Sequence, residues 1–179
     1  MVDTFQELIS FIKNPVLEED KNTKFQYRLL KFWHFLVISL LTSLVLILLI
    51  GILDISKLVS LENHAMENVM EKFSLPFVFL LTIVLAPLIE ESIFRAPLAY
   101  FKKKKPYKIA VYTSTLLFGF IHITNFEITT RILIFSPILV APQVFLGFYL
   151  AYIRGRFGLL WAIALHATFN GILMLPELF

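Results

Sequence analysis

The sequence predicts an all-α protein: a polytopic transmembrane helix bundle of about five spans, with an N-terminal helix on the membrane surface. Composition and apolar run length predict this class. Of the 179 residues, 58% are hydrophobic and only 16% are charged, whereas soluble domains are about 45–50% apolar and about 25% charged. The apolar runs are about 20 residues long, which is enough to cross a hydrocarbon core of about 30 Å.

Charge and cysteine content exclude several classes of function. The chain has no cysteine, so neither a disulfide framework nor thiolate chemistry is available. The net charge of +3 suggests nucleic acid only superficially, because the basic residues cluster beside apolar runs, where they set orientation in a membrane. We therefore expect a lipid bilayer as a partner and no nucleic acid.

Residues 1–31 form a polar N-terminal region with an expected surface helix. Thr4 and Glu7 fit a capping box at its start. One helical face carries apolar residues at i, i+3, i+4 and i+7, namely Phe5, Leu8, Ile9 and Ile12. Such an amphipathic helix lies well at a membrane surface. Pro15 ends it, because the residue before proline is disfavoured in the α region.

Residues 32–179 form the expected transmembrane domain. Its apolar spans are predicted at 33–53, 75–101, 107–126, 132–153 and 157–176. Residues 54–74 are polar and are expected to form a loop or a surface helix. Pro137 and Pro142 interrupt the fourth span, and a tight turn at 154–156 is expected to lead into the fifth.

The distribution of Lys and Arg predicts the orientation. With the N-terminus in the cytoplasm, three basic residues face the opposite side, namely Lys57, Lys72 and Arg131. Twelve face the cytoplasm, namely Lys13, Lys21, Lys24, Arg28, Lys31, Lys102, Lys103, Lys104, Lys105, Lys108, Arg154 and Arg156. By the positive-inside rule, the chain is a multi-pass cell-membrane protein with its C-terminus on the opposite side.

The second span carries three ionisable residues, Glu90, Glu91 and Arg95. A charge at the centre of a membrane helix costs roughly 2.5–3.5 kcal/mol on translocon scales, so such residues are usually paired and functional. Glu91 and Arg95 are spaced i, i+4 with the acid first, which favours an ion pair. Glu90 is left as the acid without a local partner.

Two histidines lie at a similar expected depth in other spans. From the cytoplasmic ends, a rise of 1.5 Å per residue puts Glu90 roughly 18 Å deep, His166 roughly 14 Å and His122 roughly 22 Å. All three fall in a middle slab of the bilayer. Helices from three spans could therefore bring them together.

Two kinds of chemistry suit these residues. Two histidines and a carboxylate match a water-activating metal site, with Glu90, His122 and His166 as ligands if a divalent metal such as zinc is bound. Without a metal, Glu90 can activate water, a histidine can assist or protonate the leaving amine, and Asn170 can donate to an oxyanion. Any one of these residues alone would more simply join helices, but the set at one depth favours function.

A non-catalytic function is the alternative. A bacteriocin self-immunity factor or a small ion-coupled transporter could also hold buried charges, and the proline-interrupted fourth span is a feature of transporters. Function that persists after Glu90, His122 and His166 are all replaced would favour immunity. Ion flux without peptide cleavage would favour transport.

Three motifs carry a family resemblance. They are E-E-x-x-x-R at Glu90–Arg95, F-x-x-x-H at Phe118–His122 and H-x-x-x-N at His166–Asn170. In this order on successive apolar spans, they resemble the CPBP family (CAAX protease and bacteriocin-processing, also called Abi) of intramembrane endopeptidases. The resemblance covers a catalytic core of about residues 75–176.

The resemblance implies a role for each motif residue. Glu90 would activate water and His122 would assist it. His166 and Asn170 would stabilise the oxyanion or hold the site, and Glu91 and Arg95 would form a supporting ion pair. The family was named as metalloproteases on motif grounds. The implied partner is a peptide or protein substrate, including membrane-anchored ones, and relatives of this size are linked to bacteriocin maturation or self-immunity.

Overall fold

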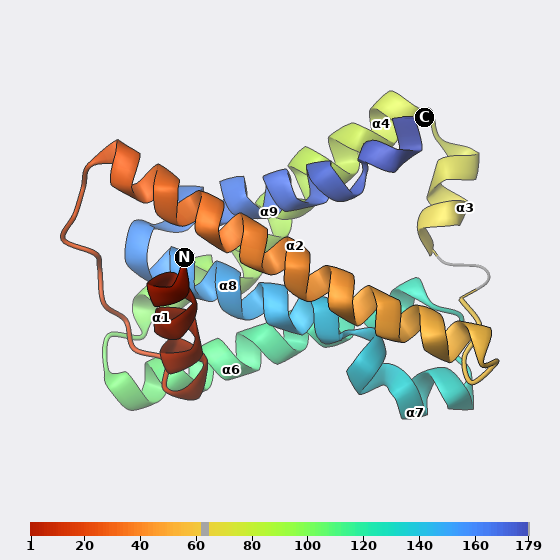
Figure 1. The fold of residues 1–179 in the computed structure, drawn as a ribbon, viewed down its shortest axis with the longest axis horizontal. Coiled ribbons are helices and arrows are strands. Elements are labelled where there is room, and N and C mark those ends of the chain that lie inside the picture. Colours follow the sequence, from red (N-terminus) through yellow and green to blue (C-terminus); the bar gives the residue numbers. More distant parts are fainter. Residues whose placement is uncertain (62–64, 179) are drawn as a thin grey trace.

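The computed structural model of the chain describes residues 1–61 and 65–178. Every regular element in these residues is a helix (Figure 1), so the predicted all-helical membrane bundle is confirmed. The expected loop or surface helix at 54–74 contains a short helix, α3 (Ala65–Lys72). Within the predicted region 54–74, residues 62–64 lie outside the described residues.

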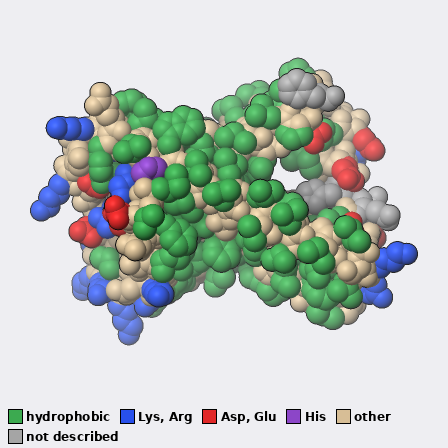
Figure 2. Space-filling model, in the orientation of Figure 1, with side chains coloured by type: hydrophobic (Ala, Val, Ile, Leu, Met, Phe, Trp, Pro, Cys, Tyr) green, Lys and Arg blue, Asp and Glu red, His purple; other side chains and the backbone are tan. Residues whose placement is uncertain are grey.

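Three helical runs are long and apolar enough to cross a membrane, at Phe25–Ile55, Leu75–Tyr100 and Thr130–Phe157. Helix α2 forms the first run. Helices α6 (Lys104–Ile121) and α9 (Leu159–Leu173) overlap the other two predicted spans but are not among these three runs. The second run comprises α4 (Leu75–Phe79), the π-helix η1 (Leu80–Leu85), α5 (Ala86–Phe94) and the 3₁₀ helix η2 (Ala96–Tyr100). Figure 2 shows hydrophobic side chains covering the middle of the molecule, with most Lys and Arg at one end.

The C-terminal half of the third run, α8 (Ala141–Phe157), lies at the centre of the bundle. It packs against α2, α6 and α9 (Figure 1). Leu150 and Ile153 on this helix are fully buried, as are Val111 on α6 and Leu165 on α9. Because α8 contacts three helices, it fixes the positions of α9, which carries His166, and of α6, which leads directly into His122.

The predicted fourth span is two helices. Helix α7 (Thr130–Leu139) has Val140 as its C-cap, and α8 begins at Ala141. Pro142 is in the first turn of α8, where its missing N–H leaves no hydrogen bond unmade within that helix. A continuous helix would need that N–H to reach Ile138, so Pro142 separates the two segments. The predicted interruption at Pro137 is wrong, because this residue lies inside α7.

The predicted turn at Arg154-Gly155-Arg156 is wrong. These residues continue α8 as far as Phe157, and the chain turns at Gly158, whose φ of 101° is in the left-handed region. Glycine adopts this conformation without the strain that a Cβ would cause. Gly155 is needed for a different reason, because a Cβ there would lie 2.8 Å from the Tyr107 hydroxyl.

A helix forms where the surface helix is predicted, but the predicted capping box does not form. Helix α1 (Val2–Lys13) has Met1 as its N-cap, and Thr4 is inside the helix. The Thr4 hydroxyl instead contacts His34 Nδ1 at 3.0 Å and accepts a hydrogen bond from Lys31 at 3.2 Å. The side chain is buried against α2 because these partners on α2 satisfy it.

We expect Gly119→Leu to destabilise the bundle. A Cβ at Gly119 would overlap the side chain of Val144 on α8, and overpacking costs about 1–3 kcal/mol. Thermal unfolding in detergent should show a lower midpoint. Gly51→Leu on α2 is the matched control, since nothing lies within 4 Å of its Cβ position, and equal midpoints for the two variants would contradict the packing.

Candidate active site

The helix that carries Glu90 and Glu91 begins after a break in its hydrogen-bond register. In η1, the Ala86 N–H donates to Leu81 O, five residues earlier, which is the π-helical pattern. The next bond in that register would run from residue 87 to Thr82 O. Residue 87 is proline, which has no N–H to donate.

Asn170 on α9 provides the missing donor. Its side-chain amide donates to Thr82 O at 3.0 Å. An unpaired carbonyl is costly in a membrane, where no water replaces the lost bond. The bond therefore stabilises the π-helix and ties α9 to the segment that leads into α5. It also gives Asn170 a structural partner that the sequence did not predict.

Glu91 is the centre of a buried polar cluster. One of its carboxylate oxygens, Oε1, lies 3.2 Å from Arg95 Nη1, and both side chains have no exposed surface. The same oxygen accepts a hydrogen bond from His166 Nδ1 at 3.0 Å. A carboxylate only accepts, so Nδ1 of His166 carries a proton in this arrangement. The Glu91–Arg95 pair was predicted from spacing, and the contact with His166 was not.

Glu90 faces the other side of the same imidazole. Its Oε2 lies 3.8 Å from His166 Nε2, and its side chain is 28% exposed, against 0% for Glu91. This separation is an electrostatic contact and is too long for a hydrogen bond. His166 thus lies between two carboxylates: Glu91 is fully buried, whereas the Glu90 side chain is partly exposed although its Oε2 is buried.

Phe118 connects the remaining residues. The Arg95 guanidinium stacks on its ring with Cζ 3.9 Å from the centroid, a cation–π contact that compensates the buried charge. The rings of His122 and His166 contact it edge-on, with centroids 5.0 and 5.7 Å away. Gly147 on α8 allows this close packing, because a Cβ there would lie 3.1 Å from Arg95 Nη2.

His122 lies just past the end of α6, in the 3₁₀ helix η3 (His122–Asn125). Its Nδ1 is 2.7 Å from Phe118 O. A carbonyl can only accept, so Nδ1 is the protonated nitrogen and Nε2 of the neutral ring has a free lone pair. The predicted third span would have continued the α-helix past His122. The change to 3₁₀ geometry gives His122 a fixed backbone partner.

The structure therefore brings together five of the six predicted site residues: Glu90, Glu91, Arg95, His122 and His166. Asn170 is one turn beyond His166 on α9 and is directed toward η1.

A sequence model of the family described as type II CAAX prenyl endopeptidase Rce1-like matches residues 72–172, more than half of the chain. The chain belongs to this family. Membership makes it a CAAX-protease-like peptidase of the membrane and confirms the family predicted from the three motifs, all of which lie within the matched residues. No curated protein and no solved structure matches the chain.

Glu90, His122 and His166 are the residues that could hold a metal in this family member. Over residues 1–61 and 65–178, no three His, Asp or Glu side chains form a group that could hold a metal ion. Nδ1 of each histidine is already bonded within the protein. These bonds leave Nε2 of each ring as the nitrogen that could ligate, but in the described residues the two nitrogens and Glu90 do not form a three-ligand metal site.

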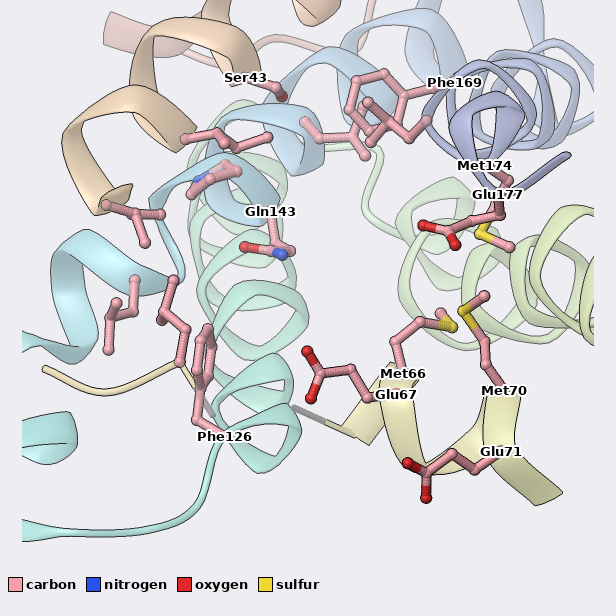
Figure 3. A pocket seen from close by; sticks show the side chains of 17 residues that line it. Ser43, Met66, Glu67, Met70, Glu71, Phe126, Gln143, Phe169, Met174 and Glu177 are labelled. Carbon is pink, nitrogen blue, oxygen red and sulfur yellow. The ribbon is translucent and has the colours of Figure 1, made fainter. Parts of the chain in front are cut away.

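A cavity of about 840 Å³ opens among α2, α3, α8 and α9. Figure 3 shows Glu67, Gln143 and Glu177 around this space and Phe169 at its edge. Most of its other lining residues are apolar. Phe169 is three residues after His166 on the same helix, so the cavity reaches within one helical turn of the polar cluster.

Two features of this site were missed by sequence reasoning. The first is the bond from Asn170 to a backbone carbonyl. Its only signal in the sequence was Pro87, which has no N–H and so leaves a carbonyl in its own span without a donor. The bond from His166 to Glu91 had no sequence signal, since it depends on how α5 and α9 are rotated against each other.

We expect Glu91→Ala to destabilise the protein strongly. It would leave Arg95 as an unpaired buried charge, and removing one partner of a buried pair costs about 3–5 kcal/mol. The thermal unfolding midpoint in detergent should fall well below that of the wild type.

Glu18→Ala is the matched control for Glu91→Ala. Glu18 pairs with Arg156 at 3.4 Å, but its side chain is 67% exposed, so little stability should be lost. Similar midpoints for Glu91→Ala and Glu18→Ala would show that the buried pair does not stabilise the fold.

Proposed function

We propose that this protein is an intramembrane endopeptidase in which Glu90 activates a water molecule to hydrolyse a peptide bond. One observation carries the proposal. Glu90 is the partly exposed carboxylate beside an imidazole whose other nitrogen is held by a buried carboxylate. A general base must be accessible, and its partner must be held in one orientation.

In the proposed first step, water binds between Glu90 and His122. Glu90 accepts one water proton, and the free Nε2 of His122 accepts a hydrogen bond from the other O–H. The water oxygen then attacks the carbonyl carbon of the peptide. A C–O bond forms, and the carbonyl oxygen becomes an oxyanion.

In the second step, the C–N bond breaks and Glu90 returns its proton to the leaving amine. His166 faces the same space through Nε2 and stabilises the oxyanion when this nitrogen is protonated. Glu91 keeps the ring in place by accepting from Nδ1, the role of an orienting carboxylate. Arg95 compensates the charge of Glu91. Asn170 holds the π-helix before Glu90, which makes it a positioning residue in this mechanism.

The cavity shown in Figure 3 is the proposed entrance for the substrate. Its apolar lining suits a membrane-anchored peptide, and Glu67 and Glu177 at its edge suit basic flanking residues. The family description makes prenylated CAAX peptides the first substrates to test.

By the positive-inside rule, the Lys- and Arg-rich end faces the cytoplasm.

Glu90→Gln should abolish most proteolysis, with a fall in kcat of about 10²–10⁴-fold, because the amide cannot accept the water proton. Membrane proteomics of cells with wild-type and Glu90→Gln protein should reveal a peptide fragment that disappears. A synthetic peptide spanning that cleavage site then gives kcat with purified protein.

Glu18→Gln is the control for the loss of one carboxylate outside the site and the substrate entrance, since Glu18 is 67% exposed, and it should retain kcat. Full proteolysis by folded Glu90→Gln would refute the assigned base. Biological function that survives the joint replacement of Glu90, His122 and His166 would instead favour a non-catalytic immunity role.

The proposed mechanism uses only protein groups, so activity should survive dialysis against a chelator. Elemental analysis of the same active sample measures bound metal. Stoichiometric zinc, together with activity that is lost on chelation and restored by zinc, would contradict this water-activation scheme.

A further inference from the structure

A second cavity, of about 520 Å³, lies at the basic end of the bundle, away from the polar cluster. Its volume is within the range of small-molecule sites. Its charged lining residues are predominantly basic: Lys21, Arg28, Lys102, Arg154 and Arg156, with the acids Glu19 and Asp20. It therefore has a net positive lining that neither the proposed catalysis nor the helix packing explains.

Two buried donors at this cavity lack a partner. Within the described parts of the chain, Arg154 Nε and the Tyr107 hydroxyl are buried without a hydrogen bond. Arg154 lines the cavity, whereas Tyr107 does not, and its hydroxyl is 2.8 Å from where a Cβ of the lining residue Gly155 would be. Both groups can donate, and burying them unpaired is costly. A hydrogen-bond acceptor bound near these two donors would satisfy them.

The two acids do not supply that acceptor. Asp20 is already engaged, since its carboxylate accepts from Tyr27 at 2.9 Å and from the Asn22 N–H at 2.8 Å. Glu19 is exposed. No ion pair between Arg154 and an acidic side chain occurs among the residues that the structure describes.

Two neighbouring arginines are already positioned. Arg156 pairs with Glu18 at 3.4 Å. Arg28 donates from Nε to Asn22 O at 3.1 Å and lies over the Phe157 ring. These contacts fix the guanidinium groups beside the cavity. A group of arginines with one unpaired member suits a phosphate group, which accepts several charge-assisted hydrogen bonds.

The position of the cavity indicates that the phosphate belongs to a lipid headgroup. Arg28 is near the start of the first membrane-crossing helix, Lys102 follows the end of the second, and Arg154 is near the end of the third. Basic residues at these depths meet lipid headgroups. Gly158, which precedes α9, also lines the cavity, and the free N–H groups at a helix start favour an anion.

We propose that this cavity binds the phosphate headgroup of an anionic phospholipid, with Arg154 as its main contact and Lys102 as a second. This site is separate from the peptidase centre and does not depend on the proposed mechanism. The expected ligand is a phospholipid whose headgroup has a phosphodiester and no positively charged group beside it.

The test measures lipid binding by purified full-length protein in detergent. Dihexanoyl-phosphatidylglycerol is titrated against dihexanoyl-phosphatidylcholine, with inorganic phosphate as a third probe, and both the dissociation constant and the thermal unfolding midpoint are recorded. The phosphatidylglycerol should bind and raise the midpoint. The phosphatidylcholine should bind at least about tenfold more weakly, because its choline puts a cation beside the arginines.

Variants locate the site. Arg154→Gln should weaken phosphatidylglycerol binding by about tenfold or more, the value of one charge-assisted hydrogen bond. Lys102→Gln should weaken it by several-fold, and because Lys102 is exposed, this variant should fold even if Arg154→Gln does not. Lys103→Gln is the control, since it removes the same charge from an exposed neighbour that does not line the cavity.

The results of these titrations distinguish a lipid site from a phosphate site and from no site. Phosphatidylglycerol binding that is lost in the first two variants and kept in the third supports a lipid site. Inorganic phosphate that binds as tightly as phosphatidylglycerol would overturn the lipid assignment. Equal affinity for the two lipids, or equal losses for Lys102→Gln and Lys103→Gln, would overturn the site itself.

Discussion

The buried bond network around Glu91 is the constraint on which the rest of the site depends. A fully buried carboxylate is tolerable in a membrane protein only with compensation, and Glu91 has it from Arg95 at 3.2 Å and His166 at 3.0 Å. Arg95 in turn needs the Phe118 ring and the space left by Gly147. Compensation of one charge therefore sets the positions of α5, α6, α8 and α9 around the site.

The same network explains why two adjacent glutamates differ. On a helix, neighbouring side chains point about 100° apart, so Glu91 faces the protein and Glu90 stays partly exposed. The π-helix before them sets this rotation, and Asn170 holds the π-helix through Thr82 O. π-helical segments often occur at functional sites. Here Pro87 accompanies the π-helix, and the π-helix sets the orientation of Glu90, the proposed catalytic base.

Local features were predictable from the sequence, and features that depend on packing were not. Hydropathy located the apolar spans, and i, i+4 spacing gave the Glu91–Arg95 pair. The turn at Gly158 was missed because the nearby Gly155 offered the same local signal, although Gly155 packs against Tyr107 of another helix. The bond from His166 to Glu91 was missed because helix rotation is a tertiary property. The three motifs indicated the right family because their order is contained in the sequence itself.

The most direct test of the account is a double-mutant cycle between Glu91 and His166, measured as kcat/KM on folded protein. If Glu91 acts by holding His166, Glu91→Gln should slow the wild type but have little further effect on the His166→Gln variant, since interacting residues are non-additive. Effects that multiply in the double variant would contradict the account, because Glu91 would then act independently of His166.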